Sequence, residues 1–88
     1  MFSAPFDDRD GSIWLDGELV DYRDAKIHVL SHGLHYASSV FEGERLYNGS
    51  IFKSREHTER LLRSANVVGY EIPYSIDEIE RAKLNVVK

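Results

Sequence analysis

The sequence contains no cysteine and, among its 88 residues, only one methionine and two prolines. Without cysteine the chain has no disulfide framework and no thiolate metal site, and its composition fits a reducing compartment. Apolar residues occur in runs of two or three, so we expect no membrane-spanning segment. The first eight residues, MFSAPFDD, contain neither a basic nor an apolar stretch, which excludes a secretory signal. Together these absences predict a cytoplasmic protein.

Positive charge is scarce in the first part of the chain. Residues 1–24 contain seven acidic residues and two arginines, a net charge of −5, against +1 for the rest. Nucleic acid is therefore excluded as a partner, because phosphate contacts need clustered lysine and arginine. A length of 88 residues, with 42% hydrophobic and 30% charged residues, predicts one small globular domain.

Two tight turns predict two β-hairpins. Asp16 and Gly17 separate strands expected at 13–15 and 18–22, and Asn48 and Gly49 separate strands expected at 41–47 and 50–53. Both dipeptides supply the positive φ angles of a two-residue turn. Between the hairpins, residues 24–40 follow neither the helical nor the strand period. We expect a short helix at 34–39 inside this long connection.

Two helices are predicted after the second hairpin. Ser54 is expected to cap the first, whose apolar stripe of Leu61, Ala65 and Val68 ends at Gly69.

The second helix starts at a capping box formed by Ser75 and Glu78. It carries Ile79, Ala82 and Val86 on one face and reaches the last residue without a stop signal. Because helices usually end with such a signal, we expect the natural protein to continue beyond this point.

The expected strand 41–47 places Phe41, Gly43, Arg45 and Tyr47 on one face. An aromatic ring, a bare backbone patch, a guanidinium and a phenol suit a cleft wall for a partly apolar, partly anionic ligand. The alternative is a solvated face on which Arg45 and Tyr47 pair across the hairpin. The residues alone leave both interpretations open and favour the solvated face.

Arg60 lies at the edge of the apolar stripe of its helix. From this position its guanidinium can offer a planar pair of donors to a phosphate. The alternative is a surface ion pair with Glu56, four residues earlier, and spacing alone favours that pair.

Histidines at positions 28, 32 and 35 have the spacing of a helical metal site. Gly33 interrupts that helix, however, and no carboxylate completes the cluster. We therefore expect no metal site, and we expect His57 to be a packed, hydrogen-bonded side chain.

The run SHGLHYASSVFEG (31–43), followed by EHTERL (56–61), resembles the small domain of the fold-type IV pyridoxal-phosphate (PLP) enzymes. It is most similar to the branched-chain amino acid aminotransferases, in which the two motifs have this separation. The resemblance implies an α/β small domain over residues 1–88, a β-sheet built from hairpins with helices packed on one side. It also implies that the chain continues into a PLP-binding large domain. The implied reaction transfers an amino group between L-leucine, L-isoleucine or L-valine and 2-oxoglutarate.

The resemblance assigns roles to individual residues. Arg60 would bind the PLP phosphate, and Phe41 would line the pocket for the apolar substrate side chain. Tyr36 would reach the pocket of a neighbouring subunit, which implies a homodimer or a higher homo-oligomer. Gly43 and Arg45 would lie near the substrate.

The chain lacks the lysine that forms a covalent bond with PLP and transfers the proton. None of its four lysines, Lys26, Lys53, Lys83 and Lys88, matches the family's catalytic position, so this lysine is expected beyond residue 88. The glutamate that pairs with the pyridine nitrogen is also expected there. We therefore expect the 88-residue chain alone to be inactive, to retain no PLP, and to need the remainder of its own polypeptide as a partner.

Other members of the superfamily remain alternatives. D-amino acid aminotransferases and aminodeoxychorismate lyases usually have a Gly-Asp-Gly segment where this chain has ASS (37–39). Glu44 replaces a commonly apolar residue, which leaves the substrate range open toward amine transaminases. From a different class, a stand-alone, non-catalytic binding module is a further possibility, as is a fragment produced by proteolysis after Lys88.

Overall fold

The computed structural model describes residues 8–87. The elements, in chain order, are β1 (Ser12–Leu15), β2 (Glu18–Asp21), the 3₁₀ helix η1 (Tyr22–Asp24), α1 (His32–His35), β3 (Leu46–Tyr47), β4 (Ser50–Ile51), α2 (Ser54–Val67) and α3 (Ile76–Val86). Most of the N-terminal stretch considered for a secretory signal, and Lys88, lie outside the described residues. The described helices include none that is long and apolar enough to cross a membrane.

Both predicted hairpins are confirmed. β1 pairs with β2 and β3 pairs with β4, each antiparallel, as two separate two-stranded sheets. Asp16 and Gly17 have φ angles of 51° and 93°, and Asn48 and Gly49 have 48° and 80°. Positive φ at both central positions matches the twist of the flanking strands. Local turn chemistry therefore fixes where both hairpins reverse.

The strand predicted at 41–47 is much shorter than expected, because only Leu46 and Tyr47 pair with β4. The Phe52 amide still donates to the Arg45 carbonyl at 2.8 Å. At Lys53 the backbone turns away with φ 51° and enters α2. Residues before Arg45 therefore have no strand opposite them in the described chain.

The prediction that Ser54 caps α2 is wrong by one position. Lys53, in the left-handed conformation, is the N-cap residue, and the His57 amide donates to its carbonyl at 3.1 Å. Ser54 lies inside the first turn, and its hydroxyl donates to the Glu80 carboxylate at 2.9 Å. Its side chain is thus part of the contact between the two helices.

The end of α2 agrees with the prediction. Gly69 has a φ of 91°, and its amide donates to the Asn66 carbonyl at 3.1 Å. The Tyr70 amide donates to the Ala65 carbonyl at 2.8 Å. These two bonds form a Schellman motif, which requires a left-handed residue at the position that Gly69 occupies.

The predicted capping box of α3 is confirmed. The Glu78 amide donates to the Ser75 hydroxyl at 3.1 Å, and the Ser75 amide donates to the Glu78 carboxylate at 3.0 Å. Just before the cap, the Tyr74 ring packs edge-on against Trp14 of β1, with 4.8 Å between centroids. This contact places the first hairpin against α3.

The short helix lies earlier than predicted. α1 covers His32–His35 instead of 34–39. The amides of Leu34 and His35 donate to the Ser31 carbonyl. Ala37 then has a φ of 58°, a left-handed conformation that ends the turn.

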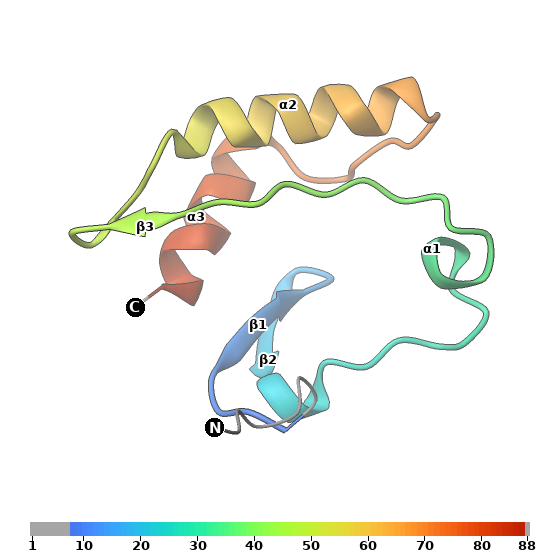
Figure 1. Ribbon diagram of the computed structural model, residues 1–88, viewed down its shortest axis with the longest axis horizontal. Coiled ribbons are helices and arrows are strands. Elements are labelled where there is room, and N and C mark those ends of the chain that lie inside the picture. Colours follow the sequence, from blue (N-terminus) through green and yellow to red (C-terminus); the bar gives the residue numbers. More distant parts are fainter. Residues whose placement is uncertain (1–7, 88) are drawn as a thin grey trace, which may run out of the picture.

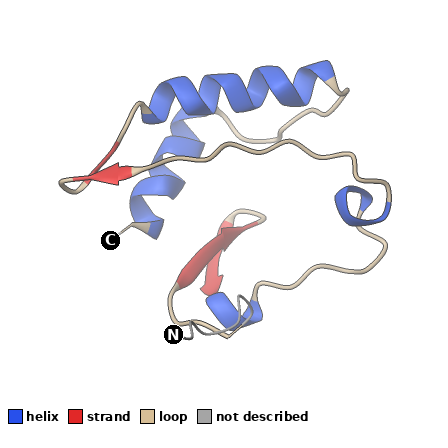
Figure 2. Cartoon of the chain, in the orientation of Figure 1, coloured by secondary structure: helices blue, strands red, loops and turns tan. Residues whose placement is uncertain are grey.

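α2 packs against α3, and α3 packs against β1. The connection between α1 and β3 runs alongside α2 in the opposite direction (Figure 1). Figure 2 shows how much of the chain between the first hairpin and β3 is loop. The buried residues among those described, Thr58, Ala65 and Ala82, all lie in the two long helices. The combination of small antiparallel sheets with packed helices confirms the α/β class.

Candidate functional site

Arg60 of α2 is bound by a carboxylate from the connection that precedes β3. Its Nε donates to Glu42 Oε2 at 2.8 Å, and its Nη2 donates to Oε1 at 2.6 Å. His57 Nδ1 lies 2.6 Å from the same Oε1. The Glu42 side chain is 8% exposed, whereas that of Arg60 is 58% exposed. A nearly buried carboxylate thus orients an accessible guanidinium.

The protonation states in this cluster follow from its hydrogen bonds. An ionised carboxylate can only accept, so His57 Nδ1 donates to Glu42. The bonds from Arg60, and then from His57, lower the pKa of the Glu42 carboxyl from 4.5 to about 2. The same carboxylate raises the pKa of Arg60 above its usual value. Glu42 is therefore ionised at neutral pH. His57 is the hydrogen-bonded side chain expected from the sequence.

Arg60 retains donors for a second anion. A guanidinium has five N–H groups, and two of those of Arg60 bind Glu42. A cavity of about 180 Å³ adjoins it, lined by Lys53, Glu56, His57, Arg60 and Arg63. Three permanently cationic side chains and one carboxylate give this cavity a positive charge. Its chemistry fits a phosphate group.

The other half of the candidate site lies on the residues that flank Glu42. Phe41 is 87% exposed, and a Cβ added to Gly43 would meet no atom within 4 Å. Ser38, Val40 and Glu42 are partly buried, while the odd-numbered residues between them are exposed. The alternation expected of a strand is thus present in an extended segment. It directs Glu42 toward the helices and Phe41 away from them.

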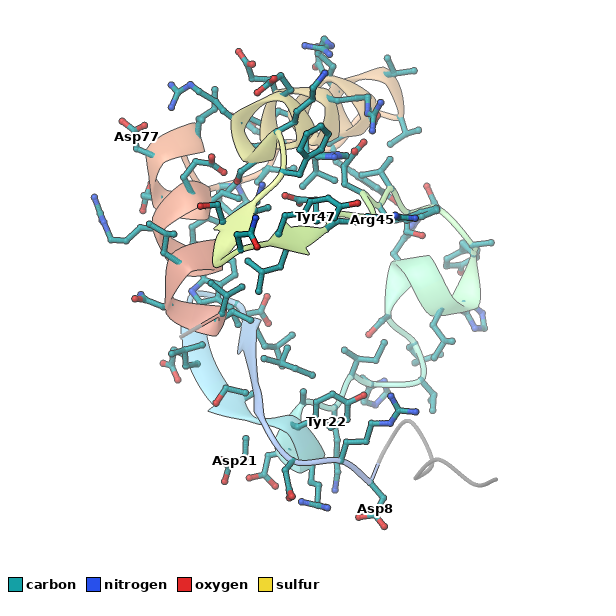
Figure 3. All side chains as sticks on the ribbon, turned by 60° about the vertical axis from the view of Figure 1, so that its left-hand side comes forward. Asp8, Asp21, Tyr22, Arg45, Tyr47 and Asp77 are labelled. Atoms are coloured by element: carbon teal, nitrogen blue, oxygen red, sulfur yellow. The ribbon has the colours of Figure 1, made fainter. Side chains whose placement is uncertain are left out.

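Arg45 contacts Tyr47 rather than Arg60. Its Nη1 donates to the Tyr47 hydroxyl at 3.3 Å, and the two side chains lie together beside β3 (Figure 3). Arg45 and Tyr47 therefore pair on an exposed face, as the residues alone favoured, but along one arm of the hairpin and not across it.

Tyr36 lies apart from this cluster, immediately after α1. Its ring contacts those of His32 and His35, with centroid distances of 5.0 and 4.7 Å. The residue is 67% exposed. Most of the Tyr36 surface is therefore accessible to solvent in the described chain.

The other groups considered in the sequence are the histidine cluster and the lysines. Within the described residues, no group of three or more potential ligands is arranged to bind a metal ion. Lys83 is engaged by surrounding oxygen atoms, and Lys53 Nζ lies 5.6 Å from the centre of the Phe52 ring.

Sequence reasoning missed Glu42 and proposed Glu56 as the ion-pair partner of Arg60. Helical spacing identifies only partners on the same helix. The strand-like alternation could have indicated Glu42, since it places this residue on the face opposite Phe41.

Known proteins share both the sequence and the shape of this chain. The probable branched-chain-amino-acid aminotransferase of Rickettsia felis is 58% identical over 76 residues, which cover 86% of this chain and 26% of that protein. The solved branched-chain aminotransferase of Thermoproteus uzoniensis with norvaline matches with a TM-score of 0.82 and 44% identity, over 90% of this chain and 28% of that one. These matches confirm the resemblance that the two motifs indicated.

A second solved structure carries a cofactor derivative. The T.th. branched-chain amino acid aminotransferase, complexed with N-(5'-phosphopyridoxyl)-L-glutamate, matches with a TM-score of 0.83 and 44% identity, over 90% of this chain and 28% of that one. The chain thus spans about a quarter of the length of its relatives. The family model described as amino-transferase class IV matches residues 39–88, which include both Glu42 and Arg60. The chain belongs to the class IV aminotransferase family.

Proposed function

We propose that this chain is the N-terminal small domain of a PLP-dependent branched-chain amino acid aminotransferase. The proposed reaction exchanges an amino group between L-leucine, L-isoleucine or L-valine and 2-oxoglutarate. Family membership and the relatives' names support the reaction class. The observation that carries the proposal is the accessible Arg60 guanidinium, oriented by Glu42 beside a cationic cavity.

Arg60 would bind the phosphate of PLP. A phosphate carries up to two negative charges and accepts hydrogen bonds from a planar pair of donors, which a guanidinium supplies. The two hydrogen bonds to Glu42 would restrict the rotamers of the arginine side chain, so less entropy would be lost when phosphate binds. PLP itself, once bound, supplies an electron sink that weakens the bonds of the amino acid's α-carbon.

Phe41 and Gly43 would form the substrate side of the site. The ring of Phe41 offers apolar surface to an aliphatic substrate, and Gly43 leaves its backbone open to close approach. Tyr36 would contribute to the pocket of a neighbouring subunit in a homo-oligomer. Arg45 would lie near the site without contacting Arg60.

The chain alone would be inactive, because none of its four lysines matches the family's catalytic position. Lys83, the most enclosed of those described, is occupied by carboxylates. The catalytic lysine would come from the large domain, which forms the other wall of the site.

The test uses the purified full-length protein that carries this chain. L-leucine and 2-oxoglutarate are mixed with it, and L-glutamate formation is followed with and without added PLP. PLP-dependent glutamate formation is expected, and replacing L-leucine by D-leucine should abolish it. Activity only with the D-amino acid, or only with a simple amine, would assign the protein to another branch of the superfamily. No reaction with any amino donor would refute the aminotransferase function.

A further inference from the structure

A second polar cluster joins α2, α3 and the segment that precedes β3. Lys83 Nζ of α3 lies 2.7 Å from Glu44 Oε1 and 3.1 Å from Glu80 Oε2. It also donates to the Ser54 carbonyl at 2.9 Å and to Thr58 Oγ1 at 2.7 Å. The Lys83 side chain is only 16% exposed. A largely buried ammonium thus contacts three separate parts of the chain.

The two carboxylates in this cluster depend on Lys83 to different degrees. Glu80 accepts hydrogen bonds from the hydroxyls of Ser54 and Thr58, at 2.9 and 2.7 Å, in addition to its contact with Lys83. Glu44 has Lys83 as its ion-pair partner within residues 8–87. Its side chain is nonetheless only 23% exposed. Removal of the ammonium would leave Glu44 partly desolvated beside a second carboxylate, which is unfavourable.

Glu44 belongs to the segment 37–45, which few other contacts hold against the helices. Residues 37–45 form no helix and no strand. The side chains of Glu42 and Glu44, both directed toward the helices, attach its second half, and the bond from Phe52 to the Arg45 carbonyl attaches its end. Each anchor therefore contributes a large share of what positions this segment.

We propose that the ion pair between Lys83 and Glu44 fixes residues 41–45 against the two helices, and that Lys83 thereby acts as a positioning residue for the substrate. The second part rests on the proposed function, in which Phe41 and Gly43 face the substrate. Lys83 touches neither of them and acts through Glu44.

The contacts of Glu42 and Glu44 should affect different properties: Glu42 the affinity for the cofactor phosphate, and Glu44 the affinity for the substrate. Glu42 binds Arg60, so its contact governs the phosphate. Glu44 has no contact with Arg60 among the described residues, so its loss shifts the substrate wall and leaves the phosphate ligand in place. Loss of Lys83 should therefore raise KM for the amino acid and leave PLP affinity nearly unchanged.

The experiment compares Lys83→Met with two matched controls in the full-length protein. Glu80→Gln neutralises the other carboxylate of the cluster and preserves its hydrogen-bonding oxygen. Arg55→Met removes an exposed ion pair, 3.3 Å long, that joins the same two helices through Asp77. A charge-swapped variant, Glu44→Lys with Lys83→Glu, tests whether the pair itself matters.

The first readout is hydrogen exchange at the Phe52 amide, which needs no activity. Lys83→Met should speed this exchange about tenfold, on the scale of one lost hydrogen bond to a charged group. Exchange at the Tyr22 amide, which donates to the Gly11 carbonyl at 2.9 Å beside the first hairpin, should stay unchanged. Both controls should behave like the wild type, and the charge swap should restore most of the protection. Unchanged exchange at Phe52 in Lys83→Met would overturn the proposal, whether or not the protein is an aminotransferase.

The second readout is steady-state kinetics with L-leucine and a PLP titration. Lys83→Met should raise KM roughly five- to tenfold with kcat and the Kd for PLP within about twofold. A lowered thermal stability with unchanged KM would show a merely structural role and overturn the positioning of the substrate. A wild-type protein that transfers no amino group would refute the proposed function instead, while the exchange result would still decide whether Lys83 fixes the segment.

Discussion

At the scale of single residues, Glu42 and His57 are largely buried, whereas Arg60, which binds the same carboxylate, is mostly exposed. The Glu42 side chain is 8% exposed, and that of His57 is 18% exposed. Charge-assisted hydrogen bonds are stronger in such surroundings than in water. Arg60 reaches this carboxylate from a largely solvated position, and its unused donors remain accessible. Glu42 thus orients the guanidinium, and Arg60 is the residue that would contact a ligand.

The first prediction concerns the titration of the Glu42 carboxyl. In the wild type the Glu42 carboxyl should titrate near pH 2. Because its pKa in the folded state lies below its ordinary value of 4.5, the stabilisation is complete above pH 4.5 and is lost as the pH falls through about 2. In Arg60→Met the pKa should rise toward the ordinary value, as carboxyl ¹³C NMR on selectively labelled glutamate would show. A pKa that stays near 2 in this variant would show that Arg60 is not its main cause.

The candidate site was only partly predictable from the sequence. The motifs indicated Arg60 as a residue that binds the cofactor phosphate, and Phe41 and Gly43 as residues near the substrate. The structure places Arg60 in contact with Glu42, which lies between Phe41 and Gly43. Spacing along a helix could not identify Glu42, because the contact joins residues 18 positions apart. The roles of Phe41, Gly43 and Tyr36 toward a ligand stay predictions, because Phe41 and Tyr36 are exposed and Gly43 has open space around it in the described chain.

At the scale of elements, local signals decide where helices and hairpins begin and end. Gly69 closes α2 in a conformation that costs residues with a Cβ about 1–2 kcal/mol. By contrast, Gly43 has no left-handed φ and has open space around it. Gly69 therefore permits the left-handed backbone that ends α2, whereas Gly43 leaves open space in the candidate site.

Gly69→Ala should destabilise the end of α2 by about 1 kcal/mol, because the new Cβ meets the backbone in the left-handed conformation. The measurement is the free energy of local opening from hydrogen exchange at the Tyr70 amide. Gly43→Ala is the control and should change that value by less than about 0.5 kcal/mol. Equal effects of the two substitutions would contradict the role given to the φ of Gly69.

The features that could be predicted are those that depend only on residues close together in the sequence. Both hairpin turns, the end of α2 and the capping box of α3 follow from residues at most a few positions apart. The strand predicted at 41–47 was mostly wrong, because a strand needs a partner and β4 ends where Lys53 turns into α2. The prediction that Ser54 caps α2 was wrong for a related reason. Its hydroxyl donates to Glu80, a residue of another helix that is distant in the sequence.

At the scale of the whole molecule, the described chain exposes much apolar surface. Fifteen large hydrophobic residues among those described are exposed, including Val29, Tyr36, Phe41 and Val67 at 67–87%. Soluble proteins rarely leave such patches uncovered. The proposed function predicts that other parts of the full-length protein and a second subunit cover this surface.

The 88-residue chain, produced alone, should bind the dye 8-anilinonaphthalene-1-sulfonate strongly and self-associate, because its apolar side chains lack their covering. The full-length protein should bind much less dye per molecule. Fluorescence titration and analytical ultracentrifugation measure the two properties. An isolated chain that stays monomeric and binds no more dye than the full-length protein would contradict this account of its surface.

The most direct test of the central claim is a PLP titration of the full-length protein and its Arg60→Met variant. The account predicts that Kd for PLP rises about tenfold or more, since the variant loses a charged hydrogen-bond donor to the phosphate. Arg55→Met, on the same helix but paired with Asp77 at the surface, should stay within about twofold of the wild type. An Arg60→Met protein that binds PLP as tightly as the wild type would contradict the assignment of this site.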